Sequence, residues 1–415
     1  MYRLWIAACW VAVPLAAQEY AAHGDPQLAA YISEALSNNP GIKESFARYR
    51  AARQRIARET ALPDPTLEVM PAVRNPGMAN VELRFSQALP WFGKRRERGA
   101  VAHQEAEVAA RLLEAAQADA VREVKQSYFE IGFLDAAAAV TDEEIRLLGH
   151  FERLAQARYA QGEGLQQEAV KLQAEITRLQ NRLEDLRIQR VAAEAGLNAI
   201  LDRPPDSKVV RVELPARPGP ALNLEVLQER ARTLSPEMRA AFEEIEKDEK
   251  RIHAARKEYW PDVRLGAGFA SLVMPSVRGG RDMWTVSVGV DLPINRRRRD
   301  AAVLEAAESM IASKEAYRRR QNEIVASIRA LTFRLETVDG QIRLLEGTLL
   351  PQAKHALRTS EDAYSTGAAG VLDLLDSERM LLDIRLGLAR LHADYLRTLA
   401  DLERAVGGPI PEVNS

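Results

Sequence analysis

The sequence of 415 residues is nearly devoid of cysteine, and its one cysteine, Cys9, lies close to the N-terminus. Residues 1–17 contain a single charge, Arg3, followed by an apolar run over 4–13 and a segment of small residues that ends at Ala17. This pattern is typical of a Sec signal peptide, so we expect cleavage before residue 18 and export of the mature chain. A mature chain without cysteine has no disulfide, no thiolate metal site and no cysteine nucleophile.

Apolar runs long enough to cross a membrane are missing from this leader. The run over 4–13 is far shorter than the ~20 apolar residues that a transmembrane helix requires. We therefore interpret it as part of the signal and not as an anchor. Ile6-Ala7-Ala8-Cys9 resembles a lipobox, but only five residues precede it, so we expect no lipid anchor.

The chain also has few aromatic residues, 6% of the total, and almost no net charge, with 57 Lys and Arg against 59 Asp and Glu. A balanced charge gives no sign of a nucleic-acid partner. We find no nucleophile elbow, zinc-protease motif, phosphate loop or dinucleotide fingerprint, and the six histidines are scattered. We therefore expect no enzyme activity, no cofactor and no metal site.

What the sequence does contain is an internal repeat. Five landmarks recur in the same order, each a second time roughly 200 residues later, which is typical of a duplicated unit. The pairs are Asn39-Pro40 with Ser235-Pro236, Pro63-Asp64-Pro65 with Pro261-Asp262-Val263, Leu89-Pro90 with Leu292-Pro293, Tyr159 to Gly162 with Tyr364 to Gly367, and Leu197 to Pro204 with Leu402 to Pro409.

These landmarks divide the mature chain into a first repeat, 18–208, a second repeat, 209–409, and a C-terminal tail, 410–415. Each repeat is expected to hold a short helix, two strands, a long helix, a glycine turn and a return helix. Alternation of apolar and polar residues predicts strands over about 65–74, 79–90, 261–272 and 282–293. Long proline-poor segments and heptad spacing predict coiled-coil helices over about 93–161, 165–202, 296–365 and 371–406.

The predicted strands are apolar on one face and polar on the other. In the last of them Trp284, Val286 and Val288 alternate with Thr285 and Ser287. Such strands fit a soluble sandwich or a membrane barrel with a wet interior. Four strands cannot close a barrel, so a membrane barrel would need strands from several chains.

The order of the local motifs resembles that of the TolC family of outer-membrane efflux proteins over essentially the whole mature chain. The motifs are Asn38-Asn39-Pro40, Pro63-Asp64-Pro65, Leu89-Pro90-Trp91-Phe92-Gly93-Lys94 and the two Tyr-x-x-Gly turns. The resemblance implies a mainly helical homotrimer in which four strands per chain form a twelve-stranded outer-membrane β-barrel, continued by a periplasmic α-helical coiled-coil barrel.

The resemblance also implies a function and partners. The chain would be the outer-membrane channel of a tripartite efflux system, passively conducting substrates received from a periplasmic adaptor, or membrane fusion protein, and an inner-membrane pump of the RND type. The segment Leu89 to Lys94 is similar to the branch that serves copper/silver and cobalt/zinc/cadmium export, so the cargo would be heavy-metal cations or drugs.

Two aspartates ring the periplasmic entrance in TolC, and by this resemblance Asp373 and Asp376 would form the selectivity gate here. The glycines of the turns are Gly162 and Gly367. The chain departs from TolC at the periplasmic entrance, because Ala369 stands where TolC has an arginine. The network of contacts that closes the entrance must therefore differ.

Aromatic and basic residues at the strand ends suggest contact with the membrane. We interpret four aromatics as an interfacial girdle: Trp91, Phe92, Trp260 and Trp284. Seven basic residues are expected to contact anionic outer-membrane lipid head groups: Lys94, Arg95, Arg96, Arg296, Arg297, Arg298 and Arg299. The alternative interpretation is an exported periplasmic coiled-coil structural or adaptor protein, which does not predict two alternating strand pairs.

Overall fold

The computed structural model describes residues 25–75, 78–219, 222–272 and 281–410. The predicted signal peptide therefore lies outside the described residues. The chain divides into two compact units. Unit 1 comprises residues 1–44, 114–235 and 322–415, and unit 2 comprises residues 45–113 and 236–321.

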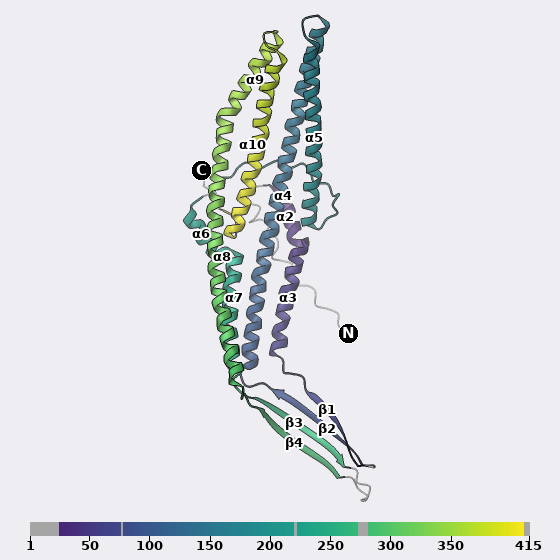
Figure 1. Cartoon of the computed structure of the whole chain (residues 1–415), viewed down its shortest axis with the longest axis vertical. Coiled ribbons are helices and arrows are strands. Elements are labelled where there is room, and N and C mark those ends of the chain that lie inside the picture. The colour runs from purple at the N-terminus through teal and green to yellow at the C-terminus, as the bar shows by residue number, and fades with distance from the viewer. Residues whose placement is uncertain (1–24, 76–77, 220–221, 273–280, 411–415) are drawn as a thin grey trace. The chain divides into compact units, whose positions relative to one another are not determined.

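Each repeat contributes the same series of elements (Figure 1). The first contains α2 (Pro26–Asn38), α3 (Pro40–Thr60), β1 (Thr66–Asn75), β2 (Met78–Leu89), α4 (Lys94–Ala160) and α5 (Gln166–Leu201). The second contains α6 (Leu224–Leu234), α7 (Pro236–Lys257), β3 (Asp262–Leu272), β4 (Arg281–Asp291), α8 (Arg296–Leu344), η1 (Leu345–Leu349), α9 (Leu350–Ser365) and α10 (Val371–Val406). The expected mainly helical, twofold-repeated architecture is confirmed.

Each repeat begins with a helix that the sequence patterns had not indicated, α2 or α6, and the expected short helix follows it as α3 or α7. Asp25 caps α2, because its Oδ1 accepts a hydrogen bond from the Gln27 backbone N–H at 2.9 Å. Asn223 caps α6 in the same way, accepting from the N–H of Glu225 at 3.0 Å. A side-chain acceptor at this position satisfies a backbone donor that the first helical turn leaves free.

Residues 296–365, where one long helix is expected, are helical throughout, but the helix is not a regular α-helix along its whole length. Helix α8 ends at Leu344, and a π-helical turn, η1, leads into α9. The cause is Pro351, which has no N–H and whose ring clashes with the carbonyl one turn earlier. A π-turn absorbs this mismatch without breaking the helix.

The four strands form one antiparallel sheet in the order β1-β2-β3-β4, and Figure 1 shows them side by side. The pairing of β2 with β3 joins the two repeats, for example through Leu83 opposite Phe269. Strands β1 and β4 each pair on one side only within the described chain. The sheet belongs entirely to unit 2.

The core of unit 1 consists of two apolar clusters between helices. One includes Tyr128, Phe129 and Leu399. The other lies nearer the glycine turns and includes Leu172 and Tyr364, both fully buried. The heptad seam predicted for the first return helix contributes Leu172, Ile176, Leu179 and Leu186, all of which are buried.

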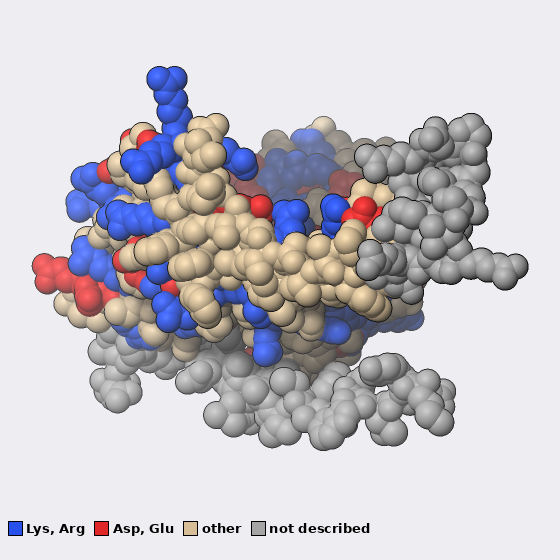
Figure 2. All heavy atoms as spheres, turned by 90° about the horizontal axis from the view of Figure 1, so that it is seen from below, with Lys and Arg blue, Asp and Glu red and all other residues tan. Residues whose placement is uncertain are grey.

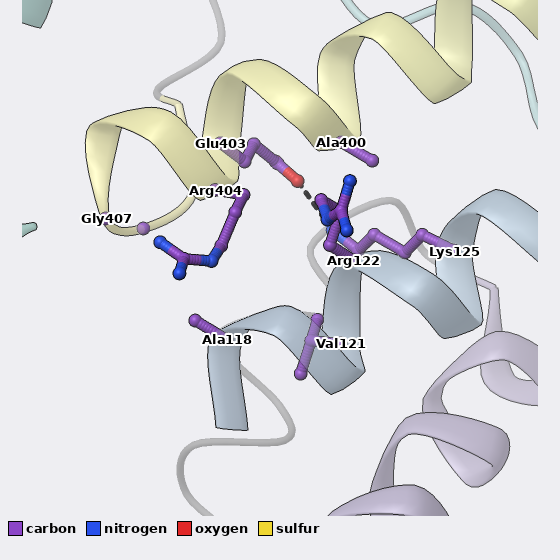
Figure 3. A pocket seen from close by; sticks show the side chains of 9 residues that line it. Ala118, Val121, Arg122, Lys125, Ala400, Glu403, Arg404 and Gly407 are labelled. Atoms are coloured by element: carbon purple, nitrogen blue, oxygen red, sulfur yellow. Dashed lines mark hydrogen bonds and ion pairs between the residues drawn. The ribbon is translucent and has the colours of Figure 1, made fainter. Parts of the chain in front are cut away.

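An ion pair is buried beside the first of these clusters. Lys125 of α4 points at Glu403 of α10, with its Nζ 2.6 Å from Glu403 Oε2, and both side chains are almost completely shielded from solvent (Figure 3). Arg122 and Arg404 line the small cavity around the pair. This contact joins the long helix of the first repeat to the last helix of the second.

Among the residues described, no helix combines the length and the apolar character that crossing a membrane would require.

Candidate functional site

The two glycine turns have the same backbone geometry. Gly162 follows α4 and Gly367 follows α9, and both have φ of 79°. Only glycine adopts this left-handed conformation without strain, which explains its place at a helix end. The N–H of Gly162 bonds the carbonyl of Tyr159 at 3.0 Å, and the N–H of Gly367 bonds that of Tyr364 at 3.1 Å. The chain reverses at both points to begin α5 and α10.

The predicted entrance residues lie directly after the second turn. Asp373 is exposed and lies in the first turn of α10, where the helix dipole favours a negative charge. Asp376 lies three residues further along and its side chain is 78% exposed. Arg379, one turn further along the helix, has its Nη1 4.0 Å from Asp376 Oδ1. The structure thus places both carboxylates on the solvated surface of one helix, near its start.

A contact between the two turns was not predicted from the sequence. Arg158, near the end of α4, donates from Nη1 to the backbone carbonyl of Tyr364 at 2.7 Å. Its guanidinium also lies over the Tyr364 ring, 5.5 Å from the centroid. Tyr364 is fully buried whereas its repeat counterpart, Tyr159, is half exposed. The duplicated Tyr-x-x-Gly motif therefore has different roles in the two turns.

The sheet in unit 2 carries a continuous apolar face. One row across the four strands is Leu67, Phe85, Ala267 and Val286, and the next is Val69, Leu83, Phe269 and Trp284. Most of these side chains are exposed, Val286 at 85%. Figure 2, seen from below, shows a broad uncharged region with basic and some acidic side chains around it.

The opposite face of the sheet is polar and has little bulk. Its rows include Thr66, Ser86, Gly266 and Ser287, and Glu68, Arg84, Gly268 and Thr285. A Cβ on Gly266 would lie 2.5 Å from the Ser287 hydroxyl and 3.3 Å from the Phe85 carbonyl oxygen, so a larger residue there would require the serine side chain to move. The sheet thus separates an apolar surface from a polar one, as its alternating sequence predicts.

Three of the four predicted interfacial aromatics come together at one end of the sheet. Trp91 and Trp260 stack with ring centroids 5.6 Å apart, and Phe92 meets Trp91 edge-on at 5.9 Å. Phe92 is 87% exposed. Trp284 is not part of this group, because it packs on Phe269 towards the other end of β4. The aromatics therefore occupy two levels of the sheet.

Lys94 is not available for the lipid contact that we expected of it, and this part of the prediction is wrong. Its side chain is 3% exposed, and its Nζ lies 2.9 Å from Asp262 Oδ1 and 3.3 Å from Glu258 Oε2. Asp262 also accepts the backbone N–H of Trp91 at 2.8 Å. The lysine of the Trp-Phe-Gly-Lys motif thus anchors the start of α4 to the start of β3.

The other basic residues divide into two sets. Arg95 and Arg299 are partly buried and donate to backbone carbonyls, Arg95 to Thr60 and Arg299 to Glu258, each at 2.8 Å or less. The exposed set comprises Arg96, Arg296, Arg297 and Arg298. Arg96 pairs with the neighbouring Glu97 at 3.0 Å. Only the exposed set can reach a surrounding surface.

Within the described ranges, no group of three or more His, Cys, Asp or Glu side chains could hold a metal ion. The local chemistry is electrostatic and steric: exposed carboxylates after a turn, a two-faced sheet and aromatic ends. Among these features there is no nucleophile with an adjacent base.

Comparison with known proteins shows the family of the chain. The family described as Outer membrane efflux protein matches residues 31–203 and 227–408. The chain is 22% identical over 377 residues to the probable outer membrane lipoprotein SilC of Salmonella typhimurium, covering 86% of this chain and 80% of that protein. It is 20% identical over 399 residues to the cobalt-zinc-cadmium resistance protein CzcC of Cupriavidus metallidurans, covering 95% and 93%.

A solved structure shares the fold over nearly its whole length. The outer membrane protein VceC of Vibrio cholerae superposes with a TM-score of 0.77 at 19% identity, covering 95% of this chain and 99% of VceC. The two family segments together span both repeats of the chain. The chain therefore belongs to the family of outer membrane efflux proteins.

Proposed function

We propose that this outer-membrane efflux channel works as a homotrimer in which the four strands of each chain join into a twelve-stranded barrel. The observation that carries the proposal is the sheet, which has an exposed apolar face, a polar face and two edges paired on one side only. Unsatisfied edge groups in lipid cost several kcal/mol each, so neighbouring copies must pair with β1 and β4.

The aromatic residues support placement of this sheet in a bilayer. Trp284 is seven residues from the end of β4 at Asp291, about 23 Å along the strand at 3.3 Å per residue and about 17 Å along the membrane normal at a tilt of about 40–45°, and Trp91 and Trp260 lie just beyond that end. Outer-membrane barrels carry aromatic girdles on both sides of an apolar band about 25 Å tall. We assign the exposed arginines Arg96 and Arg296 to Arg298 to the head groups beside Trp91 and Trp260.

The periplasmic mouth would lie at the glycine turns, with Asp373 and Asp376 as its selectivity residues. Threefold repetition would bring six carboxylates around this mouth and concentrate cations there. Acidic residues outnumber basic ones in the sequence of unit 1, which holds the turns, whereas basic residues predominate in unit 2. This distribution favours entry of cations at the turns.

For the cargo we propose heavy-metal cations. CzcC is named for cobalt, zinc and cadmium resistance, and the match between the two proteins covers 95% of this chain. The exposed aspartates suit cations, and a duct that conducts its cargo needs no tight metal site. A periplasmic adaptor and an inner-membrane pump of the RND type would complete the system. The alternative of an exported coiled-coil adaptor leaves the exposed apolar sheet without a purpose.

A deletion strain tests the cargo. We expect lower tolerance of divalent heavy-metal cations, restored by the wild-type gene, with tolerance of organic drugs unchanged. Sensitivity to drugs alone would overturn the metal assignment. Fractionation and heat-modifiable gel migration test the assembly separately: a trimer in the outer membrane is expected, and a monomer would overturn the proposed barrel.

A further inference from the structure

Two glutamates from different repeats meet in the interior of unit 1. Glu144 lies on α4 and is 3% exposed, and Glu378 lies on α10 and is 1% exposed. Each carboxyl is within hydrogen-bonding reach of the other. Glu378 is eleven residues beyond the Gly367 turn, about 16 Å at 1.5 Å per residue. The pair therefore joins the first hairpin, α4 and α5, to the second, α9 and α10, near their turns.

Other acidic groups close to the pair have cationic partners. Glu175 of α5 is also buried, and its carboxylate contacts Arg178 at 2.8 Å and Arg379 at 2.7 Å. Glu143 of α4 contacts Arg385 at 2.5 Å. Burial of a carboxylate is tolerated in this way when a cation and hydrogen bonds compensate for the lost water. Glu175 is thus a conventional buried ion.

Glu144 and Glu378 have no such compensation. Within the described residues no donor reaches either oxygen of Glu378 or Oε1 of Glu144. Two ionised carboxylates contain only acceptors, so they cannot bond each other and would repel strongly away from water. A carboxylic acid beside a carboxylate has one O–H donor and can bond. The geometry is consistent with one proton held between the two groups.

We propose that Glu144 and Glu378 form a proton-binding site that holds the two hairpins together, and that loss of this proton loosens their packing. On deprotonation the proton passes to water and leaves two adjacent carboxylates with no donor between them. This inference concerns the packing of the hairpins and does not depend on the cargo or on Asp373 and Asp376.

The surrounding charges favour retention of the proton. Burial is the largest cause that raises the pKa of both glutamates above the ordinary value. The charged groups that face them are Glu143 on α4, Glu175 on α5, Glu361 on α9 and Arg385 on α10. The three carboxylates disfavour a further negative charge, and Arg385, the one cation among these four, is already paired with Glu143.

Infrared spectroscopy of the purified full-length protein in lipid nanodiscs tests for the proton. We expect the carbonyl band of a buried carboxylic acid at about neutral pH, lost as the pH rises well above the ordinary carboxyl range. Glu378→Gln should remove this band, and Glu175→Gln, a matched buried glutamate with ion partners, should leave it. A spectrum in which Glu378→Gln removes no such band would overturn the proposal.

Hydrogen exchange of residues 371–385 tests the consequence for packing. In the wild type, after correction for intrinsic rates, local opening should increase by up to about tenfold per pH unit between the ordinary carboxyl pKa and the raised pKa of the pair, and it should level off above that range. Glu378→Gln supplies a permanent donor to Glu144, so opening should become independent of pH. A wild-type profile that is already independent of pH would contradict the inference without needing any variant to fold.

Discussion

Lys125 of α4 and Glu403 of α10 are joined by a 2.6 Å ion pair although they are 278 positions apart in the sequence. Both side chains are almost completely buried, at 2% and 6% exposure. A charge in such a place is tolerated only with its partner. The pair therefore makes the packing of the first repeat against the second depend on both charges being present.

We expect Lys125→Met to destabilise the protein by about 3–5 kcal/mol, because it leaves the Glu403 charge buried with its main cation removed. Adding Glu403→Leu should recover much of this loss, since a buried ion pair replaced by apolar groups is often close to neutral. Denaturant unfolding of the three variants checks the sign. A double variant as unstable as the single one would show that the pair is not the cause.

Asp373→Ala combined with Asp376→Ala should abolish the block of single-channel current by multivalent cations. The reason is that both exposed carboxylates follow the turn assigned to the channel mouth, and their removal eliminates the local negative potential. Planar-bilayer recordings measure the block directly. Asp185→Ala, an exposed aspartate further along α5, is the control and should leave it intact. Unchanged block in the double variant would rule out these residues as the gate.

Val286→Lys should impair assembly, while Thr285→Lys should be tolerated. Val286 is 85% exposed on the apolar face, and Thr285 lies next to it on the polar face opposite Gly268. A lysine facing lipid costs about 2–4 kcal/mol at the middle of the bilayer and less towards either interface, whereas one facing a water-filled interior does not. The yield of trimer in outer-membrane fractions distinguishes the two. Equal yields would contradict the assignment of the faces.

Arg158→Ala should loosen the second glycine turn. Arg158 donates to the Tyr364 carbonyl at 2.7 Å and lies over its ring, and a hydrogen bond from a charged donor contributes about 1.5–3 kcal/mol. Faster hydrogen exchange at residues 364–370 is the expected result. Arg146→Ala, which removes only an exposed pair with Asp142 on the same helix, should not change the exchange there.

Acidification should destabilise unit 1 through His392. Burial, followed by the nearby charge of Arg217, lowers the pKa of His392, although Glu346 acts against this shift. The Nε2 of His392 has no hydrogen-bond partner in the described structure. Below about pH 6.5 the unfolded chain then binds more protons than the folded one. The free energy of unfolding therefore decreases as the pH is lowered, by at most about 1.4 kcal/mol per pH unit.

His392→Leu should reduce this acid sensitivity, and thermal unfolding between about pH 7 and pH 5 measures it. His355→Leu, which changes an exposed histidine of α9, should leave the slope unaltered. An unchanged slope in His392→Leu would assign the acid sensitivity to other groups.

The family and the order of its elements were readable from the sequence because they depend on local signals. Proline and glycine mark element ends wherever they occur, heptads such as Leu172 to Leu186 indicate a coiled-coil seam, and alternation around Val286 indicates a two-faced strand. Duplication repeats each signal, which strengthens it. Pro351 lies within the helix predicted over 296–365 and was overlooked in that prediction; the response of the helix, a π-turn instead of a break, depends on the helix packing.

The sequence by itself determined the repeat, the helices and strands, and which face of each strand is apolar, because these follow from local periodicity. Only the tertiary structure decided the partner of each charge. It buried Lys94 against Asp262, placed Arg158 on Tyr364 from 206 positions away, and left Glu144 facing Glu378. Charged residues look alike in a sequence, and their roles differ because packing alone sets which of them lose water and what they then contact.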